Sequence, residues 1–172
     1  RSLVAQPFDP ERLRLTGSFL SIADQELDSD RTTSLSGFTV SETGVLVFQS
    51  TADSAAKLVW FDPSGKELGP FSEGAYRDPR FSPDGRFLAV SSDDSRNGKY
   101  FIRVYDLARG VSVRLTDKGH ESRPVWSRDG KEITYDSTDG RIFYMYRLPV
   151  DGSGSAQVIR KGTYMSPDDR SP

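Results

Sequence analysis

A repeat of about 40 residues most constrains what this chain can fold into. Three segments, at residues 38–48, 79–90 and 124–135, share one pattern: an apolar strand, a serine, a turn and a second apolar strand. A fourth copy begins at residues 164–169. The marker serines stand at positions 41, 82, 127 and 166, so successive copies are 41, 45 and 39 residues apart. The chain is therefore predicted to be built from copies of one small unit.

Each copy predicts four short strands and no helix. The first strand ends in an aromatic residue (Phe81 or Trp126), and a tight turn follows with Gly85 or Gly130, which adopts a positive φ at little cost. Two further strands with alternating apolar residues follow, joined by turns rich in glycine, proline and aspartate. A period of about 40–45 residues with four strands matches one β-propeller blade. The predicted fold is all-β, a set of propeller blades that are four-stranded antiparallel meanders.

The repeat also predicts how the chain divides. We expect residues 1–24 to be the outer strands of a preceding blade and 25–36 a loop. Residues 37–72, 73–117 and 118–162 would be three whole blades, and 163–172 the first strand of a following blade. Propeller rings typically contain 4–8 blades, and an open arc would expose its core at both ends. A head-to-tail homodimer would close the ring, and a longer propeller is the alternative.

The hairpin motif resembles a known family. Phe81-Ser82-Pro83-Asp84-Gly85 matches the aromatic-Ser-Pro-Asp-Gly hairpin of the TolB-type WD40-like (PD40) repeats. The copy at 126–130 departs from it only at the proline, where Arg128 stands, and the copy at 40–44 has lost both proline and aspartate. The resemblance covers nearly the whole chain and implies a TolB-like propeller.

Phrases outside the hairpins carry a second resemblance. Residues 5–9, 41–47 and 58–66 are similar to phrases in bacterial membrane serine/threonine kinases that end in a TolB-like propeller. This resemblance implies a periplasmic or otherwise extracytoplasmic sensor segment, with a cytoplasmic location as the alternative. The chain shows no Gly-rich phosphate loop, His-Arg-Asp loop or Asp-Phe-Gly motif, so kinase activity is not carried over.

Composition excludes several classes of function. A net charge of −2 and a pI of about 5.5 provide no broad basic field, so a nucleic-acid partner is not expected. No run approaches the roughly 20 apolar residues of a membrane span, so this segment is not expected to insert in a membrane. The sequence has no cysteine, which excludes thiol catalysis and disulfides.

The motifs favour a protein that is not an enzyme. His120 is the only histidine, and no Gly-x-Ser-x-Gly elbow is present to hold a nucleophile. The hairpin serines recur in every copy, which indicates turn chemistry because a nucleophile would be singular. The acidic pairs of the loops lack the alternating calcium-loop pattern. We therefore predict no catalytic residue, no metal site and no cofactor.

A binding site is expected where loops gather at one end of the blades. In a meander of four strands, the loop entering a blade and the loop between its second and third strands open on the same face. Loops on a rigid scaffold commonly carry function. The candidate ligand-binding residues for a protein, peptide or glycan are Arg77, Asp78, His120, Glu121 and Arg123. Ordinary polar loops are the competing interpretation.

Two classes of function follow. The leading hypothesis is a non-catalytic binding or sensor module, the extracytoplasmic interaction domain of a larger bacterial signalling protein. The alternative is the accessory propeller of a serine peptidase of the prolyl-oligopeptidase type, and a hydrolase built on propeller loops ranks below both.

Overall fold

The computed structural model describes residues 3–23, 38–41, 45–50, 57–62, 66–72, 74–93, 98–118, 120–163 and 167. These residues form strands and no helix. The strands are β1 (Leu3–Ala5), β2 (Phe8–Asp9), β3 (Arg14–Leu15), β4 (Leu20–Ala23), β5 (Phe38–Val40), β6 (Leu46–Ser50), β7 (Lys57–Phe61), β8 (Glu67–Ser72), β9 (Ala75–Phe81), β10 (Phe87–Asp93), β11 (Phe101–Asp106), β12 (Val111–Arg114), β13 (Glu121–Trp126), β14 (Glu132–Thr138), β15 (Phe143–Pro149) and β16 (Gln157–Gly162).

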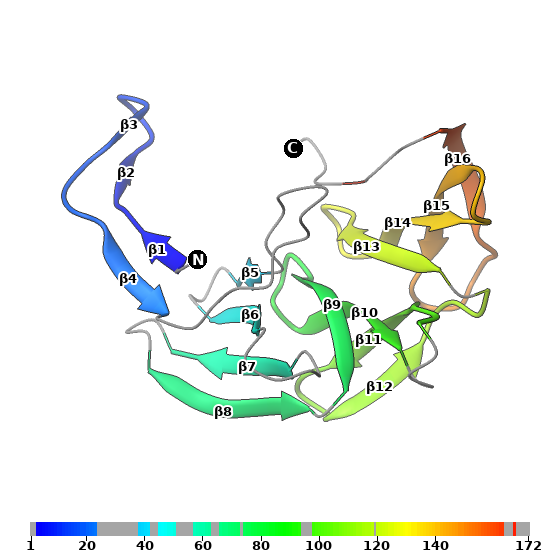
Figure 1. The fold of residues 1–172 in the computed structure, drawn as a ribbon, viewed down its shortest axis with the longest axis horizontal. Coiled ribbons are helices and arrows are strands. Elements are labelled where there is room, and N and C mark those ends of the chain that lie inside the picture. The colour runs from blue at the N-terminus through cyan, green and yellow to red at the C-terminus, as the bar shows by residue number, and fades with distance from the viewer. Residues whose placement is uncertain are drawn as a thin grey trace.

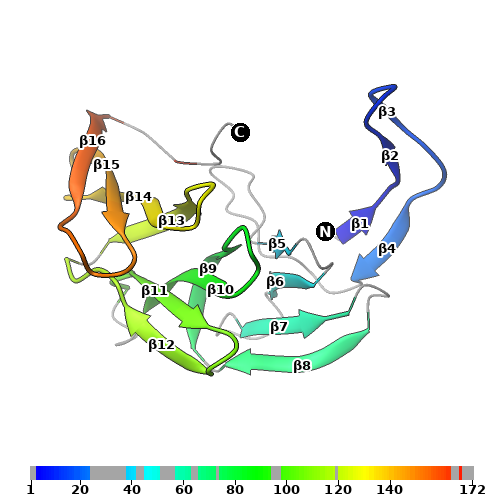
Figure 2. The same ribbon diagram turned by 180° about the vertical axis from the view of Figure 1, so that it is seen from behind.

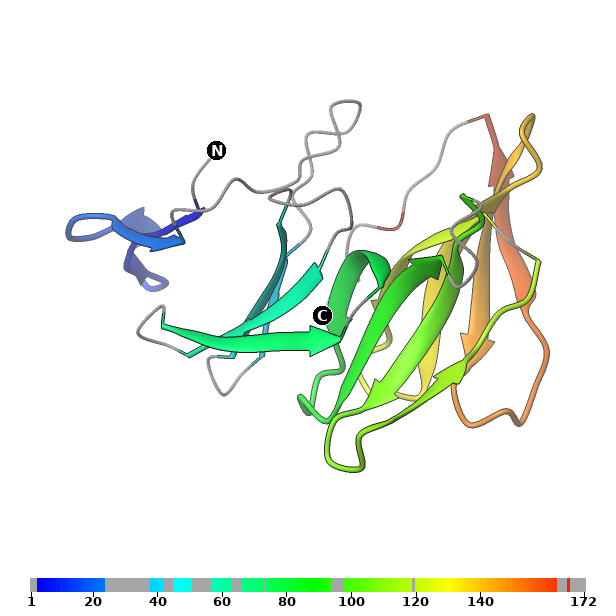
Figure 3. The same ribbon diagram turned by 60° about the horizontal axis from the view of Figure 1, so that its bottom comes forward.

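Three four-stranded antiparallel sheets form the body of the molecule (Figures 1 and 2). We call them blade 1 (β5–β8), blade 2 (β9–β12) and blade 3 (β13–β16); in each, every strand pairs with the next along the chain. Strand β9 contacts both β5 and β13, while β8, β12 and β16 lie at the outer rim. Figure 3 shows blades 2 and 3 packed face to face. The predicted fold class, all-β with partial-propeller blades, is confirmed.

The hairpin between the first two strands of a blade explains the repeated serine. In blade 2 the Ser82 hydroxyl donates to Asp84 Oδ1 at 2.6 Å and accepts from the backbone amide five residues on, at 2.9 Å. Blade 3 repeats both bonds, with Ser127 donating to Asp129 at 2.7 Å. The bond from the serine is the largest cause that lowers the pKa of each aspartate. The two marker serines are therefore turn-forming residues.

The apolar core lies between neighbouring blades. Strand β10 is buried on both faces: Leu88 and Val90 belong to the cluster shared with blade 1, and Ala89 to the cluster shared with blade 3. A sheet covered on both sides reads as a continuous apolar run. The cluster between blades 2 and 3 consists of Ala89, Ile102, Trp126, Ile133, Tyr135 and Leu148. Because neighbouring blades bury each other's faces, the blades form one continuous stack.

The N-terminal segment is a long, narrow ribbon beside blade 1. Strands β1 and β4 pair with each other, and β2 and β3 pair farther out. Ile22 packs against the apolar cluster of blade 1. The segment predicted as outer strands of a preceding blade thus contains four short strands in two separate pairs. Large apolar side chains are exposed along the ribbon at Val4, Phe8, Leu13, Leu15, Phe19 and Leu20.

Two predicted segments lie outside the described residues. These are the loop at 25–36 and, apart from the buried Pro167, the fourth copy of the repeat at 164–169. The head-to-tail homodimer, which depends on that fourth copy, therefore stays a prediction.

Candidate functional site

The inner strands β9 and β13 share an irregularity near their starts. The pairing register shifts between Ala89 and Ser91 in blade 2, and between Ser122 and Val125 in blade 3. At each shift one residue has a left-handed backbone: Asp78 with φ 51° and Arg123 with φ 54°. A fully buried proline follows each of them. A residue before proline normally adopts an extended conformation, so both blades hold a strained backbone at the same place.

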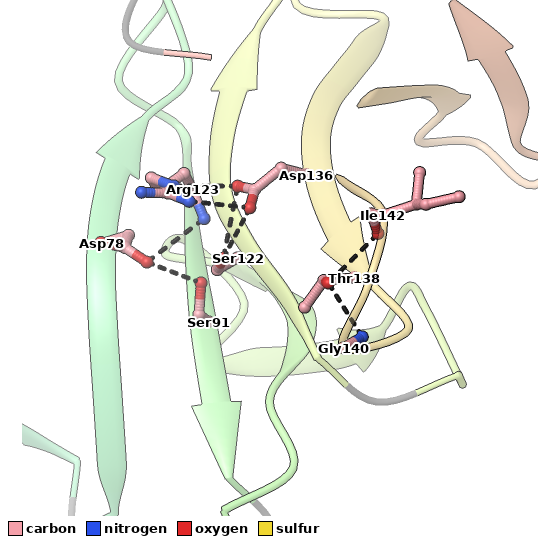
Figure 4. Close-up of polar contacts among 8 residues, drawn as sticks. All are labelled: Asp78, Ser91, Ser122, Arg123, Asp136, Thr138, Gly140 and Ile142. Atoms are coloured by element: carbon pink, nitrogen blue, oxygen red, sulfur yellow. Dashed lines mark hydrogen bonds and ion pairs between the residues drawn. The ribbon is translucent and has the colours of Figure 1, made fainter. Parts of the chain in front are cut away.

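In blade 2 the strained residue is a hydrogen-bond acceptor. Asp78 Oδ2 accepts from the Ser91 hydroxyl at 3.1 Å and from the backbone amide of Arg123 at 3.2 Å. The first bond lies within blade 2 and the second crosses to blade 3 (Figure 4). Asp78 therefore links the starts of the two inner strands.

In blade 3 the strained residue is a cation. Arg123 donates Nε–H to Asp136 Oδ1 at 3.0 Å and an Nη2–H to Oδ2 at 2.9 Å. The Ser122 hydroxyl donates to the same carboxylate. Burial raises the pKa of the Asp136 carboxyl, and the Arg123 guanidinium opposes that rise. A bidentate pair of this kind fixes both side chains in orientation as well as position.

Tyr100, just before β11, connects the remaining candidates. The Arg77 guanidinium carbon lies 4.5 Å from the centre of the Tyr100 ring, a cation–π arrangement. The Tyr100 carbonyl accepts from the Glu121 amide at 3.0 Å, so this residue bridges blades 2 and 3. His120, which directly precedes Glu121, is exposed and has a left-handed φ of 78°. We call Arg77, Tyr100 and His120 the junction site.

The five residues predicted from the sequence thus all lie near the starts of β9 and β13. The structure brings Asp78 and Arg123 into direct contact. It places the Arg77 guanidinium over the Tyr100 ring and the Glu121 amide against the Tyr100 carbonyl. Glu121 itself is 1% exposed, and its Oε1 accepts from the Lys118 amide at 3.2 Å. The bonds of Asp78, Glu121 and Arg123 therefore connect strands and blades, whereas Arg77 and His120 are exposed to solvent.

Sequence reasoning missed Tyr100 and Asp136. In the sequence Tyr100 is an aromatic residue at the start of an apolar strand, and no local pattern marks it as part of a site. Its role becomes visible only through its contact with blade 3. In the sequence Asp136 resembles the other carboxylates of the polar loops, although it is 2% exposed and lies within β14. Its alignment with Ser91 of blade 2, 45 residues earlier, is the sequence signal that identifies its place.

Among the described residues, no group of three or more histidine, aspartate or glutamate side chains is placed to hold a metal ion. Within the same part of the chain, no helix has the length and apolar character needed to cross a membrane.

Comparison with known proteins places this geometry in context. No protein-family model matches the sequence. The TolB structure from Acinetobacter baumannii superposes with a TM-score of 0.68 over 83% of this chain, at 21% identity. The fold is that of a TolB-like β-propeller. The chain spans 35% of the length of that TolB chain.

Part of the similarity is to peptidases. A prolyl endopeptidase structure superposes with a TM-score of 0.59 over 86% of this chain and 25% of its own length, at 21% identity. In sequence, the uncharacterized peptidase YuxL of Bacillus subtilis (strain 168) is 34% identical over an alignment of 85 residues, which covers 47% of this chain and 13% of YuxL. These likenesses concern the blades and leave the activity of the whole protein open to proposal.

Proposed function

We infer that this chain is a non-catalytic binding and sensor module, the extracytoplasmic interaction domain of a larger bacterial signalling protein. The junction site is where it binds a protein, peptide or glycan. The observation that carries this proposal is the way in which blades 2 and 3 differ from each other.

Within the inner strand and the hairpin that follows it, blades 2 and 3 share a set of structural residues. Both have a buried proline (79 and 124), an aromatic residue (81 and 126), and a serine, aspartate and glycine in the hairpin. The four residues before the proline differ at every position: Ala-Tyr-Arg-Asp in blade 2 and His-Glu-Ser-Arg in blade 3. Along the inner strand, the repeat is therefore kept from the proline to the hairpin and lost at the junction end.

The junction site is also held in place before any ligand arrives. Cross-blade bonds fix the backbone on both sides of it, from Arg123 to Asp78 and from Glu121 to Tyr100. Rigid side chains lose little entropy on binding, which favours recognition. Strained backbone held by its surroundings is typical of functional sites.

The extracytoplasmic assignment and the signalling role rest on the likeness of residues 5–9, 41–47 and 58–66 to phrases of bacterial membrane kinases. The natural coding sequence tests this directly. A kinase domain and a membrane span upstream of residue 1 support the proposal, and a chain without them contradicts the signalling role.

Binding itself is tested by screening the full chain against arrays of peptides and glycans. The informative variant is Tyr100→Ala, which removes the ring beneath Arg77, and the matched control is Phe143→Ala on β15. We expect ligands that bind the natural chain to be lost or weakened by Tyr100→Ala and retained by the control. Ligands that bind both variants equally would show that binding occurs elsewhere.

A second function is favoured by the likeness to YuxL and the prolyl endopeptidase. In this alternative the blades are the accessory propeller of a serine peptidase whose catalytic domain lies elsewhere in the natural chain. A Gly-x-Ser-x-Gly elbow encoded downstream of residue 172 would establish it in place of the signalling role.

A further inference from the structure

Blade 3 has one face toward blade 2 and one face that points away from it. Successive side chains on a strand point to opposite faces of a sheet. Ile133 and Leu148 belong to the apolar cluster shared with blade 2, so the residues beside them on β14 and β15 point the other way. We call Glu132, Thr134 and Arg147 the outward face of blade 3. Figure 1 shows this blade at one end of the stack of described blades.

Blade 2 carries apolar residues at the three positions equivalent to the outward face. Equivalence follows from the bond that the marker serine amide donates to the second strand, and from the pairing of the second strand with the third. The equivalent residues are Phe87 and Glu132, Ala89 and Thr134, and Val104 and Arg147. In blade 2 all three side chains are part of the apolar cluster against blade 3.

Blade 1 resembles blade 2 at these positions. Val47 pairs with Trp60, and the two residues stand where blade 2 has Ala89 and Val104. Both belong to the apolar contact between blades 1 and 2. Each of these two blades therefore offers an apolar surface to the blade that follows it, and blade 3 does not.

The charges of the outward face are paired with each other at the surface. Arg147 Nε lies 3.6 Å from Glu132 Oε1, and the two side chains are 43% and 32% exposed. Arg147 also donates an Nη2–H to Gln157 Oε1 at 3.4 Å. A further sheet stacked here would remove water from both charges, and that cost can exceed the attraction between them.

The hairpin of blade 3 differs in the same sense. A Cβ on Gly130 would meet the Pro83 ring of blade 2 at 3.8 Å, so the blade 3 hairpin lies against that proline. In blade 3 the position of Pro83 is occupied by Arg128, which is exposed. A following hairpin would therefore meet a charged side chain in place of an apolar ring.

The opposite end of the stack is apolar. Leu46, Val59 and Phe61 form a buried cluster in blade 1, and Ile22 of the N-terminal ribbon packs against it. The polar surface is thus particular to the blade 3 end. In stacked repeats, a terminal unit with a polar outer face keeps the stack soluble.

We propose that the outward face of blade 3 is a polar end of the stack, open to water in this chain. It does not hold another blade or a second copy by the apolar stacking that joins blades 1, 2 and 3. The proposal does not depend on the binding function proposed above. A head-to-tail homodimer would have to bury the outward face, so we expect that the chain does not close a ring in this way.

The test measures self-association of the full 172-residue chain by sedimentation velocity over a range of concentrations. The informative variant combines Glu132→Phe with Arg147→Val, which gives blade 3 the residues of blade 2. We expect it to self-associate about tenfold or more tightly than the natural chain, because two newly apolar side chains leave water on stacking. No gain in association would overturn the proposal, since polarity would then not be what keeps the face open.

The matched control makes the same kind of change at another exposed place. It combines Lys66→Val with Glu67→Phe at the start of β8, where both residues are exposed. We expect this variant to associate as the natural chain does and to have the same circular dichroism spectrum. An equal gain in the control would overturn the proposal, because any added apolar surface would then be sufficient.

Arg147→Glu tests whether the natural chain uses the outward face for self-association. This variant places two carboxylates side by side, which opposes any contact made through the face. Any association of the natural chain should be unchanged by Arg147→Glu, because it would occur elsewhere. Loss of that association in the variant would overturn the proposal, since the face would then be an interface between copies.

A measurement on the natural chain decides the matter if the double variant does not fold. A soluble paramagnetic gadolinium chelate broadens the NMR signals of groups that it can approach. We expect it to broaden the Arg147 Nε–H and the Gln157 side-chain amide signals equally at low and at high protein concentration. Protection of these signals that increases with concentration would show a covered face and would contradict the proposal.

Discussion

Blades 2 and 3 have the same backbone at the start of the inner strand and opposite charges on it. Asp78 and Arg123 share a left-handed φ, a shift in pairing register and a buried proline that follows. Their partners occupy equivalent positions on the second strand, Ser91 in blade 2 and Asp136 in blade 3. The repeat thus determines where a polar pair lies, and the chemistry of the pair varies independently from blade to blade.

The difference also has an energetic side. The blade 2 pair joins a carboxylate to a hydroxyl, whereas the blade 3 pair buries two full charges, with the Asp136 side chain 2% exposed and that of Arg123 16% exposed. Breaking a buried ion pair is more costly than losing a neutral donor, because the charge that remains loses its bidentate partner in a buried place. The equivalent substitutions should therefore have unequal effects.

The largest expected effect is that of Asp136→Ala, which leaves the Arg123 guanidinium buried without its carboxylate. We expect it to lower the free energy of unfolding by about 3–5 kcal/mol. The equivalent change in blade 2, Ser91→Ala, should cost about 1 kcal/mol. Urea unfolding followed by tryptophan fluorescence measures both. Similar losses in the two blades would contradict the expected difference between a buried ion pair and a hydrogen bond from a hydroxyl.

Core substitutions should show no such contrast. Leu88 and Ile133 occupy equivalent positions on β10 and β14, and each is fully buried between two blades. Leu88→Ala and Ile133→Ala should each lower the free energy of unfolding by about 2–5 kcal/mol, through lost burial and a residual cavity. The same urea titrations compare them, and a loss in one blade only would mean that the blades unfold separately.

The hairpin glycines sharpen the comparison, because their backbone is the same in both blades. Gly85 has φ +69° and Gly130 has φ +68°, and a Cβ at either position would meet its nearest neighbour at 3.7 Å and 3.8 Å. Both positions therefore have room for a methyl group, so the cost of a substitution comes from the positive φ. Gly85→Ala and Gly130→Ala should each cost about 1–2 kcal/mol. Thermal unfolding measures the pair; an effect below experimental error at both sites would contradict a requirement for positive φ.

The smallest effect concerns pH and the hairpin of blade 2. The bond from Ser82 lowers the pKa of Asp84, so folding is favoured by the ionised carboxylate. Since the folded pKa lies below the usual 3.8, this stabilisation is present above that pH and is lost as the pH falls through the folded value. Ser82→Ala should therefore destabilise the protein by about 1 kcal/mol at neutral pH and by less in acid. A difference in stability that stays constant with pH would contradict this role for Asp84.

The sequence predicted the fold well because the repeat acts through local chemistry. The serine, aspartate and glycine of each hairpin make their bonds within a few residues, so the turn at 82–85 follows from its own sequence. The pattern could not indicate the left-handed backbone of Asp78 and Arg123, because that conformation depends on pairing with the next strand.

The sequence predicted which loops the candidate residues belong to, and it did not predict how those residues contact one another. Repeat alignment led to the starts of the inner strands, which are where Arg77 and His120 lie. The cross-blade bond from Glu121 to Tyr100 joins residues that are distant along the chain, and no local pattern predicts it. The division of the five candidates into framework and exposed residues depends on burial, which only the packed blades define.

The central claim is that ligands bind where blades 2 and 3 differ and not where they agree. Its most direct measurement is chemical-shift mapping of the ¹⁵N-labelled full chain with a ligand selected from the peptide and glycan arrays. The account predicts that the largest shifts fall on Arg77, Tyr100 and His120, with the hairpin residues Ser82 and Ser127 unchanged. Largest shifts on the hairpins, or spread evenly along the outer strands, would contradict it.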